Sequence, residues 1–180
     1  MSAASLQVRG ARDRLGLKGP RATDWLTEQG IAFPAAANTW GGGSSGADTG
    51  LLVARLGTGE FFLEDVEGGD RLRRIAPASE SHPPGVYPVL RQDAAFLLSG
   101  DGGADVLAQV CNVNFPALVL DSRPVIMTLM VGVAVLVVPR DLDGQRQYLI
   151  WCDPTFGPYL AESLGNIVIE CGGNYRGVPI

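Results

Sequence analysis

Two neighbouring side chains and one isolated histidine are the candidates for acid–base or nucleophilic chemistry in this sequence. His82 is the single histidine and lies in a stretch rich in proline and serine, residues 77–85. Cys152 is followed directly by Asp153 and Pro154. A nucleophile–histidine–acid triad needs the histidine held against both partners, and a histidine in a linker lacks that support. We therefore expect an exposed histidine and an aspartate that caps a helix, and we assign no catalytic residue.

The three cysteines do not form a recognisable redox or metal-binding pattern. Cys111, Cys152 and Cys171 are odd in number and show neither a CxxC motif nor a Cys/His spacing. Disulfide frameworks and zinc sites use even sets of cysteines or close Cys/His pairs. The sequence therefore predicts reduced, mostly buried thiols, and we assign no metal ligand.

A glycine-rich run at residues 41–50 is the candidate for phosphate or dinucleotide binding. Loops that bind dinucleotides follow a buried strand and open a helix, whereas this run leads into a predicted strand at residues 51–56. The one lysine, Lys18, precedes Gly19 and Pro20 and does not fit a phosphate-binding loop. We expect a surface loop, and the residues that would bind a cofactor stay unknown.

Arginines near residue 70 are candidates for contact with a partner subunit. Arg71 and Arg74, with Arg73 between them, form a basic cluster in a chain whose formal net charge is −5. The planar guanidinium group binds carboxylates in a bidentate manner, so these residues could contact an acidic partner. A solvated helix face is the alternative explanation.

Aromatic residues of the first half are the second set of candidates for a subunit contact. Phe61 and Phe62 are consecutive in a predicted strand, where successive side chains point to opposite faces. An outward phenylalanine would mark a subunit contact, and packing under the terminal helices is the competing explanation. Trp40, next to Gly41, is the third aromatic candidate.

Length and composition exclude several classes of protein. The chain has 180 residues, of which 46% are hydrophobic and 18% are charged, so a globular protein is expected. Its acidic charge argues against binding nucleic acid or an anionic membrane. The longest apolar run, Val125–Val138, is shorter than the roughly 20 residues needed to cross a bilayer. Residues 1–14 lack the apolar stretch of a signal peptide, so we expect a cytoplasmic protein.

The chain reads as two halves with the same order of elements. The first half predicts a strand at 15–18, a helix at 21–29, strands at 51–56 and 60–63, and an amphipathic stretch at 70–75. The second half predicts a strand at 95–99, a helix capped by Asp101, strands at 125–138 and 147–152, and a helix at 155–169. A shift of 81 positions aligns Leu17 with Leu98 and Gly19 with Gly100.

This order predicts an α+β fold with mainly antiparallel sheet, because connected hairpins alternate with helices. We expect one domain, residues 1–180, built of two pseudo-symmetric β-α-β-β-α half-repeats at about 14–76 and 86–170. The Pro/Ser-rich stretch at 77–85 has the composition of a linker between them.

Several motifs resemble the gamma subunit of heterotetrameric sarcosine oxidase. In the first half these are Leu17-Lys18-Gly19-Pro20-Arg21-Ala22 and Arg55-Leu56-Gly57-Thr58-Gly59-Glu60-Phe61-Phe62-Leu63. In the second half they are Cys111-Asn112-Val113-Asn114-Phe115 and Thr155-Phe156-Gly157-Pro158-Tyr159-Leu160. More remotely, the chain is similar to the folate-binding domain of glycine-cleavage aminomethyltransferases. The resemblance extends from about Leu15 to Leu164 and rests mostly on glycines, prolines and apolar residues, which report fold better than activity.

The resemblance implies an accessory, non-catalytic subunit of a flavin-dependent amine oxidase linked to one-carbon metabolism. It places flavin and tetrahydrofolate in larger flavoprotein subunits and no cofactor in this chain. Aminomethyltransferases carry an acidic pair on a mid-domain strand, whereas the similar stretch Met130–Leu136 has no carboxylate. The alternatives are a free-standing tetrahydrofolate-binding protein like an aminomethyltransferase, and a duplicated α+β interaction domain that serves another complex.

Overall fold

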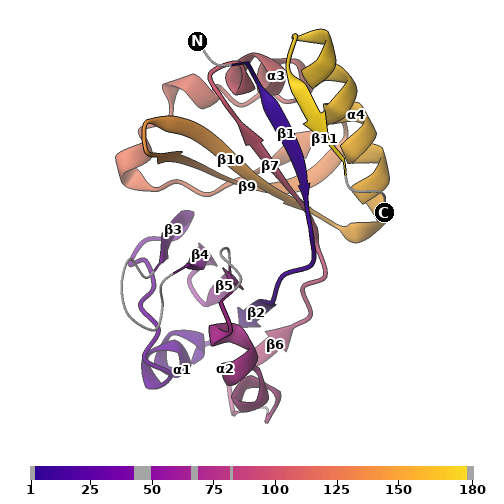
Figure 1. The fold of residues 1–180 in the computed structure, drawn as a ribbon. Coiled ribbons are helices and arrows are strands. Elements are labelled where there is room, and N and C mark those ends of the chain that lie inside the picture. Colours follow the sequence, from indigo (N-terminus) through magenta and orange to yellow (C-terminus); the bar gives the residue numbers. More distant parts are fainter. Residues whose placement is uncertain (1–2, 43–49, 66–68, 82, 178–180) are drawn as a thin grey trace. The chain divides into compact units, whose positions relative to one another are not determined.

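The computed structural model describes residues 3–42, 50–65, 69–81 and 83–177. The chain divides into two compact units, of which unit 1 comprises Met1–Gly10 and Gln92–Ile180, and unit 2 comprises Ala11–Arg91 (Figure 1). His82 and residues 43–49 of the glycine-rich run lie outside the described residues, so the expectations for them stay predictions.

Unit 2 contains a five-stranded antiparallel sheet with the strand order β3-β4-β5-β2-β6. Its strands are β2 (Arg14–Lys18), β3 (Thr39–Gly42), β4 (Leu51–Gly57), β5 (Glu60–Asp65) and β6 (Tyr87–Val89). Helices α1 (Ala22–Glu28) and α2 (Arg71–Glu80) cover one face of this sheet (Figure 1). Trp25 and Leu26 of α1 pack with Leu17 and Leu63 of the sheet in a single hydrophobic core.

Helix α2 is longer than the sequence predicts. It continues through Pro77 to Glu80, where residues 77–85 were expected to form a linker. Leu72, Ile75 and Ser79 are buried at helical spacing, so packing on the sheet continues the helix past the proline. The Ser79 hydroxyl donates a hydrogen bond to the carbonyl of Ala76 at 2.8 Å. Tertiary packing therefore outweighs the low helix propensity of this segment.

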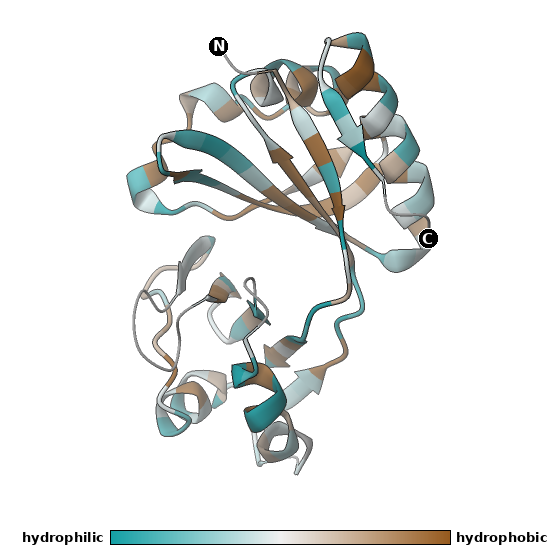
Figure 2. Ribbon diagram, viewed as in Figure 1, coloured by the Kyte–Doolittle hydropathy of each residue, from teal (hydrophilic) through white to brown (hydrophobic). Residues whose placement is uncertain are grey.

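Unit 1 contains a six-stranded sheet with the strand order β11-β1-β7-β10-β9-β8. The strands are β1 (Ser5–Arg9), β7 (Ala94–Ser99), β8 (Ile126–Met130), β9 (Val133–Leu142), β10 (Gln145–Cys152) and β11 (Asn174–Arg176). Every neighbouring pair is antiparallel except β1 and β11, which are parallel. Figure 2 shows the hydrophobic residues of β7 in the middle of this sheet.

Two helices, α3 (Gly103–Val110) and α4 (Gly157–Glu170), cover one face of the sheet of unit 1. Short 3-10 turns are found at Phe115–Ala117, Leu120–Ser122 and Pro154–Phe156. The core beneath the helices contains Tyr148 and Phe115, whose rings meet edge to face with 5.4 Å between centroids. No helix in the described part of the chain is long and apolar enough to span a membrane.

The two units contain elements in the same order. Each has a strand, a helix, three strands and a second helix, from β2 to α2 in unit 2 and from β7 to α4 in unit 1. Ala22 donates its backbone N–H to the carbonyl of Gly19 at 3.2 Å, and Gly103 does the same to Gly100 at 3.0 Å, with a separation of 81 residues between the two bonds. The superposition of the two units in space stays a prediction.

The fold class is confirmed as α+β with mostly antiparallel sheet. The predicted positions of β7, β10 and α4 agree with the structure to within about two residues. One detail is wrong, because Gly102 rather than Asp101 precedes α3 and no side chain caps that helix. Sequence reasoning also missed four short strands, namely β1, β3, β6 and β11.

Candidate functional site

The two phenylalanines proposed as a subunit contact are both buried. Phe61 is 1% exposed and Phe62 is 0% exposed, so neither ring is exposed at the surface. Phe61 packs in the core of unit 2, edge to face with Phe33 at 5.5 Å between centroids. The guanidinium group of Arg91 lies 4.7 Å from the ring centroid of Phe62. Phe61 therefore packs beneath the helices of unit 2, whereas Phe62 is not part of that core.

The remaining candidates for a subunit contact are partly engaged within unit 2. Arg71 donates to the carbonyl of Gln29 at 2.5 Å and so ties α2 to the end of α1. Arg74 forms an exposed ion pair with Asp70 at 2.9 Å. Trp40 lies half-buried on the edge strand β3. A subunit contact at these three residues stays a prediction.

Cys152 is at the end of β10 in an environment that suppresses thiolate formation. Burial raises the pKa of its thiol to about 11, with further contributions from Asp93 and Asp153. The thiol is therefore protonated at neutral pH and is a poor nucleophile. Asp153 acts as the expected cap, because its Oδ1 accepts the backbone N–H of Thr155 at 2.8 Å. The hydrogen bonds from Thr155 lower the pKa of Asp153.

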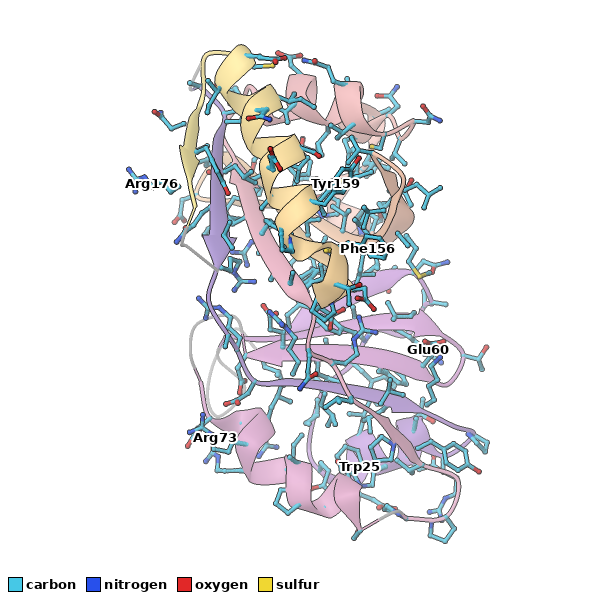
Figure 3. All side chains as sticks on the ribbon, turned by 90° about the vertical axis from the view of Figure 1, so that its right-hand side faces the viewer. Trp25, Glu60, Arg73, Phe156, Tyr159 and Arg176 are labelled. Atoms are coloured by element: carbon cyan, nitrogen blue, oxygen red, sulfur yellow. The ribbon has the colours of Figure 1, made fainter. Side chains whose placement is uncertain are left out.

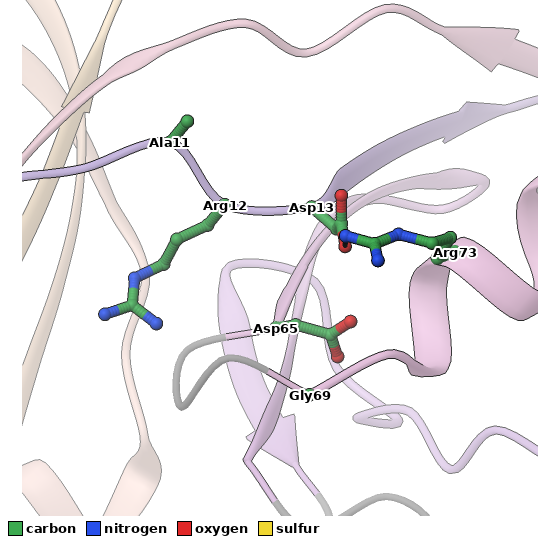
Figure 4. A pocket seen from close by; sticks show the side chains of 6 residues that line it. All are labelled: Ala11, Arg12, Asp13, Asp65, Gly69 and Arg73. Carbon is green, nitrogen blue, oxygen red and sulfur yellow. Dashed lines mark hydrogen bonds and ion pairs between the residues drawn. The ribbon is translucent and has the colours of Figure 1, made fainter.

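A polar cavity of about 310 Å³ lies in unit 2 beside the start of α2. It is lined by Ala11, Arg12, Asp13, Asp65, Gly69 and Arg73 (Figure 4). Asp65 is 2% exposed, and its Oδ2 accepts the backbone N–H of Leu72 at 3.1 Å. Burial is the largest cause that raises the pKa of Asp65. Arg73 pairs with Asp13 at 2.9 Å, so two of the charges of this cavity neutralise each other.

Sequence reasoning missed Asp65. The sequence feature that could have indicated it is an acidic residue at the end of a strongly apolar strand. A carboxylate buried at such a position needs a hydrogen-bond donor. In the structure that donor is the backbone of the first turn of α2, so the carboxylate fastens the helix to β5. The hydrogen bond from Leu72 is sufficient to explain why Asp65 is buried here, without a catalytic role.

A second cavity in unit 2, of about 500 Å³, lies at the turn between β4 and β5. Its two cationic side chains are already bound to groups of this chain. Arg55 donates to the carbonyls of Pro34, Ala35, Gly57 and Thr58 at 2.6–3.2 Å. Lys18 pairs with Glu60 at 3.0 Å. The motif around Arg55 that carries the family resemblance therefore acts as a structural clamp.

A cavity of about 510 Å³ lies in unit 1 between the end of α3 and the β8–β9 hairpin. Its lining is mixed, with Gln109, Asn112 and Thr128 as polar residues and Leu129 and Val131 as apolar ones. The stretch Met130–Leu136 comprises the end of β8, the turn and the first part of β9, and Val133 and Val135 point into the core. In the described residues, no group of three or more histidine, cysteine or acidic side chains is arranged to hold a metal ion.

Of the comparisons with known proteins, only the comparison with solved structures finds matches. No family model matches the chain, and no curated protein matches it. A chain of heterotetrameric sarcosine oxidase from Corynebacterium sp. U-96, solved in complex with pyrrole 2-carboxylate, matches with a TM-score of 0.71 at 22% sequence identity. The match covers 98% of this chain and 88% of that chain.

A second solved structure is the glycine cleavage system aminomethyltransferase T from Bartonella henselae. It matches with a TM-score of 0.67 at 16% identity over 91% of this chain. The present chain spans 45% of the length of that aminomethyltransferase. The chain thus has the fold of a heterotetrameric sarcosine oxidase chain and of part of an aminomethyltransferase, in agreement with the resemblance of its sequence motifs.

Proposed function

We propose that this chain is an accessory, non-catalytic subunit of a flavin-dependent amine oxidase complex similar to sarcosine oxidase. The observation that carries the proposal is the extent of the match to a chain of a heterotetramer. Nearly the whole of both chains is aligned, whereas less than half of the aminomethyltransferase is. Because this chain aligns with most of the sarcosine oxidase chain but with less than half of the aminomethyltransferase, a role as a separate subunit fits it better than a role as a complete aminomethyltransferase.

The interactions of four polar or nucleophilic side chains support a non-catalytic role. Arg55 and Lys18 are bound to groups of unit 2, and the thiol of Cys152 is protonated at neutral pH. The buried carboxylate of Asp65 is bound to the backbone of Leu72. These interactions explain the residues without a substrate. We accordingly place flavin and tetrahydrofolate, with the reactions that use them, in larger flavoprotein subunits.

Co-expression tests this assignment. The chain is produced with sarcosine-oxidase-type flavoprotein subunits from the same organism and applied to a size-exclusion column. We expect a yellow assembly that contains this chain and shows the visible absorption of flavin. Elution of this chain alone, as a colourless and folded monomer, would contradict the proposal.

The second candidate function is a free-standing tetrahydrofolate-binding protein. The match to an aminomethyltransferase over 91% of this chain favours it. Titration calorimetry with tetrahydrofolate separates the two candidates. Micromolar binding by the isolated chain would support the second candidate, and absence of binding would support the first.

A further inference from the structure

We propose that strand β8 is the docking site for an extended segment of a partner chain, which adds a strand to the sheet of unit 1. The proposal rests on the proposed function, because it takes the partner to be a larger subunit of the same assembly. The segment must be mainly apolar and uncharged, for reasons that the sequence and geometry of β8 provide.

Strand β8 is an edge strand whose own residues carry none of the usual protective features. It is the last strand of the six-stranded sheet, and β9 is its one partner strand among the described residues. Natural proteins protect such edges with charged residues, proline or bulges. The sequence of β8, Ile-Met-Thr-Leu-Met, contains no charge and no proline, and its register with β9 is regular. At the opposite edge, β11 ends in Arg176.

The hairpin geometry identifies the backbone groups that face outward. Val131 and Gly132 form a two-residue turn with φ angles of +43° and +87°, as in a type I′ hairpin. Met130 and Val133 are therefore a hydrogen-bonded pair, and the pairs alternate along the strands. The N–H and C=O groups of Met127 and Leu129 consequently point away from β9, toward the side on which an added strand would pair.

The side chains of these same two residues are exposed. Met127 is 56% and Leu129 is 59% exposed, and they lie on the same face of the strand. An added strand would bond to the backbone of Met127 and Leu129 and place its own alternate residues beside their side chains. Charged residues at those positions would lose hydration against an apolar pair, so the partner segment is apolar.

The surface continues beyond β8. The cavity of about 510 Å³ lies beside the end of the strand, and its lining includes Leu129 and Val131. The hydroxyl of Tyr159 donates to the carbonyl of Val131 at 3.2 Å, and Val131 donates its N–H to the carbonyl of Val110 at 2.9 Å. The turn is therefore held between α3 and α4. Tyr159, 51% exposed near the start of α4 (Figure 3), adds an exposed ring beside this turn.

The dimensions favour a large partner over a free peptide. Five residues of added strand span roughly 17 Å, which alone gives less than the about 800 Å² per partner of a stable interface. A subunit that also covers the cavity and Tyr159 reaches that size more readily. This requirement agrees with a subunit interface inside the proposed assembly.

The test uses the co-expressed flavoprotein subunits and variants of exposed residues. Met127→Lys combined with Leu129→Lys places two charges on the edge, and Leu129→Pro removes an outward N–H without breaking a bond to β9. We expect at least a tenfold loss of affinity for each. The control Ile169→Lys makes the same kind of change at a residue that is 58% exposed near the end of α4, and it should bind like the wild type.

Hydrogen exchange gives a second readout at the backbone. The amides of Met127 and Leu129 should exchange rapidly in the isolated chain and become protected in the assembly. Wild-type assembly with unchanged exchange and undiminished binding of the variants would overturn the docking site alone. Failure of the wild type to assemble would overturn the proposed function with it. A dimer of the isolated chain that the lysine variant dissociates would identify a second copy as the occupant and would also overturn the proposal.

Discussion

The guanidinium group of Arg55 connects the segment before β3, the turn between β4 and β5, and the ring of Phe61 in β5. Its four hydrogen bonds reach Pro34 and Ala35 before β3, and Gly57 and Thr58 at the end of β4. The group also lies 5.5 Å from the ring centroid of Phe61. The planar arrangement of N–H donors is what allows one side chain to satisfy several carbonyls at once.

Replacing Arg55 with lysine should destabilise the protein although it keeps the charge. Lysine has one donor group in place of the fork, so several carbonyls lose their partner and the stacking on Phe61 is lost. We expect a loss of about 2 kcal/mol in the free energy of unfolding, measured with urea. Arg73→Lys is the matched control, because Arg73 is 75% exposed and makes one surface ion pair. Equal stabilities of the two variants would contradict the clamp.

Asp65 makes a contribution to stability that depends on pH. Burial raises its pKa in the folded chain above the ordinary value of 3.8, so the folded chain binds the proton more tightly than the unfolded chain. The contribution of Asp65 is therefore most favourable in acid, below its unfolded pKa, and decreases as the pH rises through the folded pKa.

Asp65→Asn tests this dependence. Asparagine keeps an oxygen that accepts the N–H of Leu72 but cannot ionise. The variant should gain stability relative to the wild type as the pH rises from 3.5 to 7, as measured by urea unfolding at each pH. A relative gain of the wild type over the same range would show that the charged carboxylate is favoured in the folded chain.

The two hairpins of unit 1 use the same turn with different residues. The β9–β10 turn is Asp143-Gly144, with φ angles of +53° and +77°, and this pair is typical of a type I′ turn. The β8–β9 turn is Val131-Gly132, although a β-branched residue is strained at a positive φ. The hydrogen bonds of Val131 to Val110 and Tyr159 compensate for that strain.

Val131→Asn should therefore stabilise the β8–β9 hairpin. Asparagine tolerates a positive φ, and Asn-Gly is the preferred pair for this turn, so we expect a gain of about 1 kcal/mol in the free energy of unfolding. Asp143→Asn at the other hairpin is the control and should change stability little. A destabilised Val131→Asn variant would mean that packing of the valine on the core outweighs the backbone strain.

Long elements with many apolar residues could be predicted from the sequence, whereas short or polar elements could not. Strands β7 and β10 and helix α4 carry strong apolar patterns and were predicted. Strands β6 and β11 have three residues each, and β11 is polar, so their pairing depends on neighbours distant in sequence. Such strands give little local signal.

The candidate sites were less predictable than the fold. The cap by Asp153 was predicted because it depends on adjacent residues. The contact between Asp65 and Leu72, the clamp of Arg55 and the turn at Val131 depend on separated segments or on an unusual backbone angle. The burial of Phe62 also escaped prediction, because alternation along a strand places it opposite to Phe61 without showing how exposed it is.

At the scale of the whole molecule, the two units differ in how the chain builds them. Unit 2 is one continuous segment, residues 11–91, whereas unit 1 combines residues 1–10 with residues 92–180. Strand β1 lies between β11 and β7, and its Leu6 is fully buried in the core of unit 1. The sheet of unit 1 is therefore incomplete without the first ten residues.

Fragments test this organisation. Residues 11–91 expressed alone should unfold cooperatively in urea, because they contain the whole core of unit 2. Residues 92–180 alone should not, because β7 would expose its edge and the place of Leu6 would be empty. Joining residues 1–10 to residues 92–180 through a short glycine-serine linker should restore cooperative unfolding, since Arg9 and Ala95 are partners across the sheet. Cooperative unfolding of 92–180 by itself would contradict the argument.

The position of β1 has a consequence for folding during synthesis. Asn174 donates its N–H to the carbonyl of Ala4 at 2.8 Å, so β1 meets its last neighbour when almost the whole described chain has left the ribosome. Unit 2 has all of its strands once residue 91 has emerged and is free to fold first. Until β7 has been synthesised, β1 has neither of its partner strands, and its backbone N–H and C=O groups stay hydrogen-bonded to water.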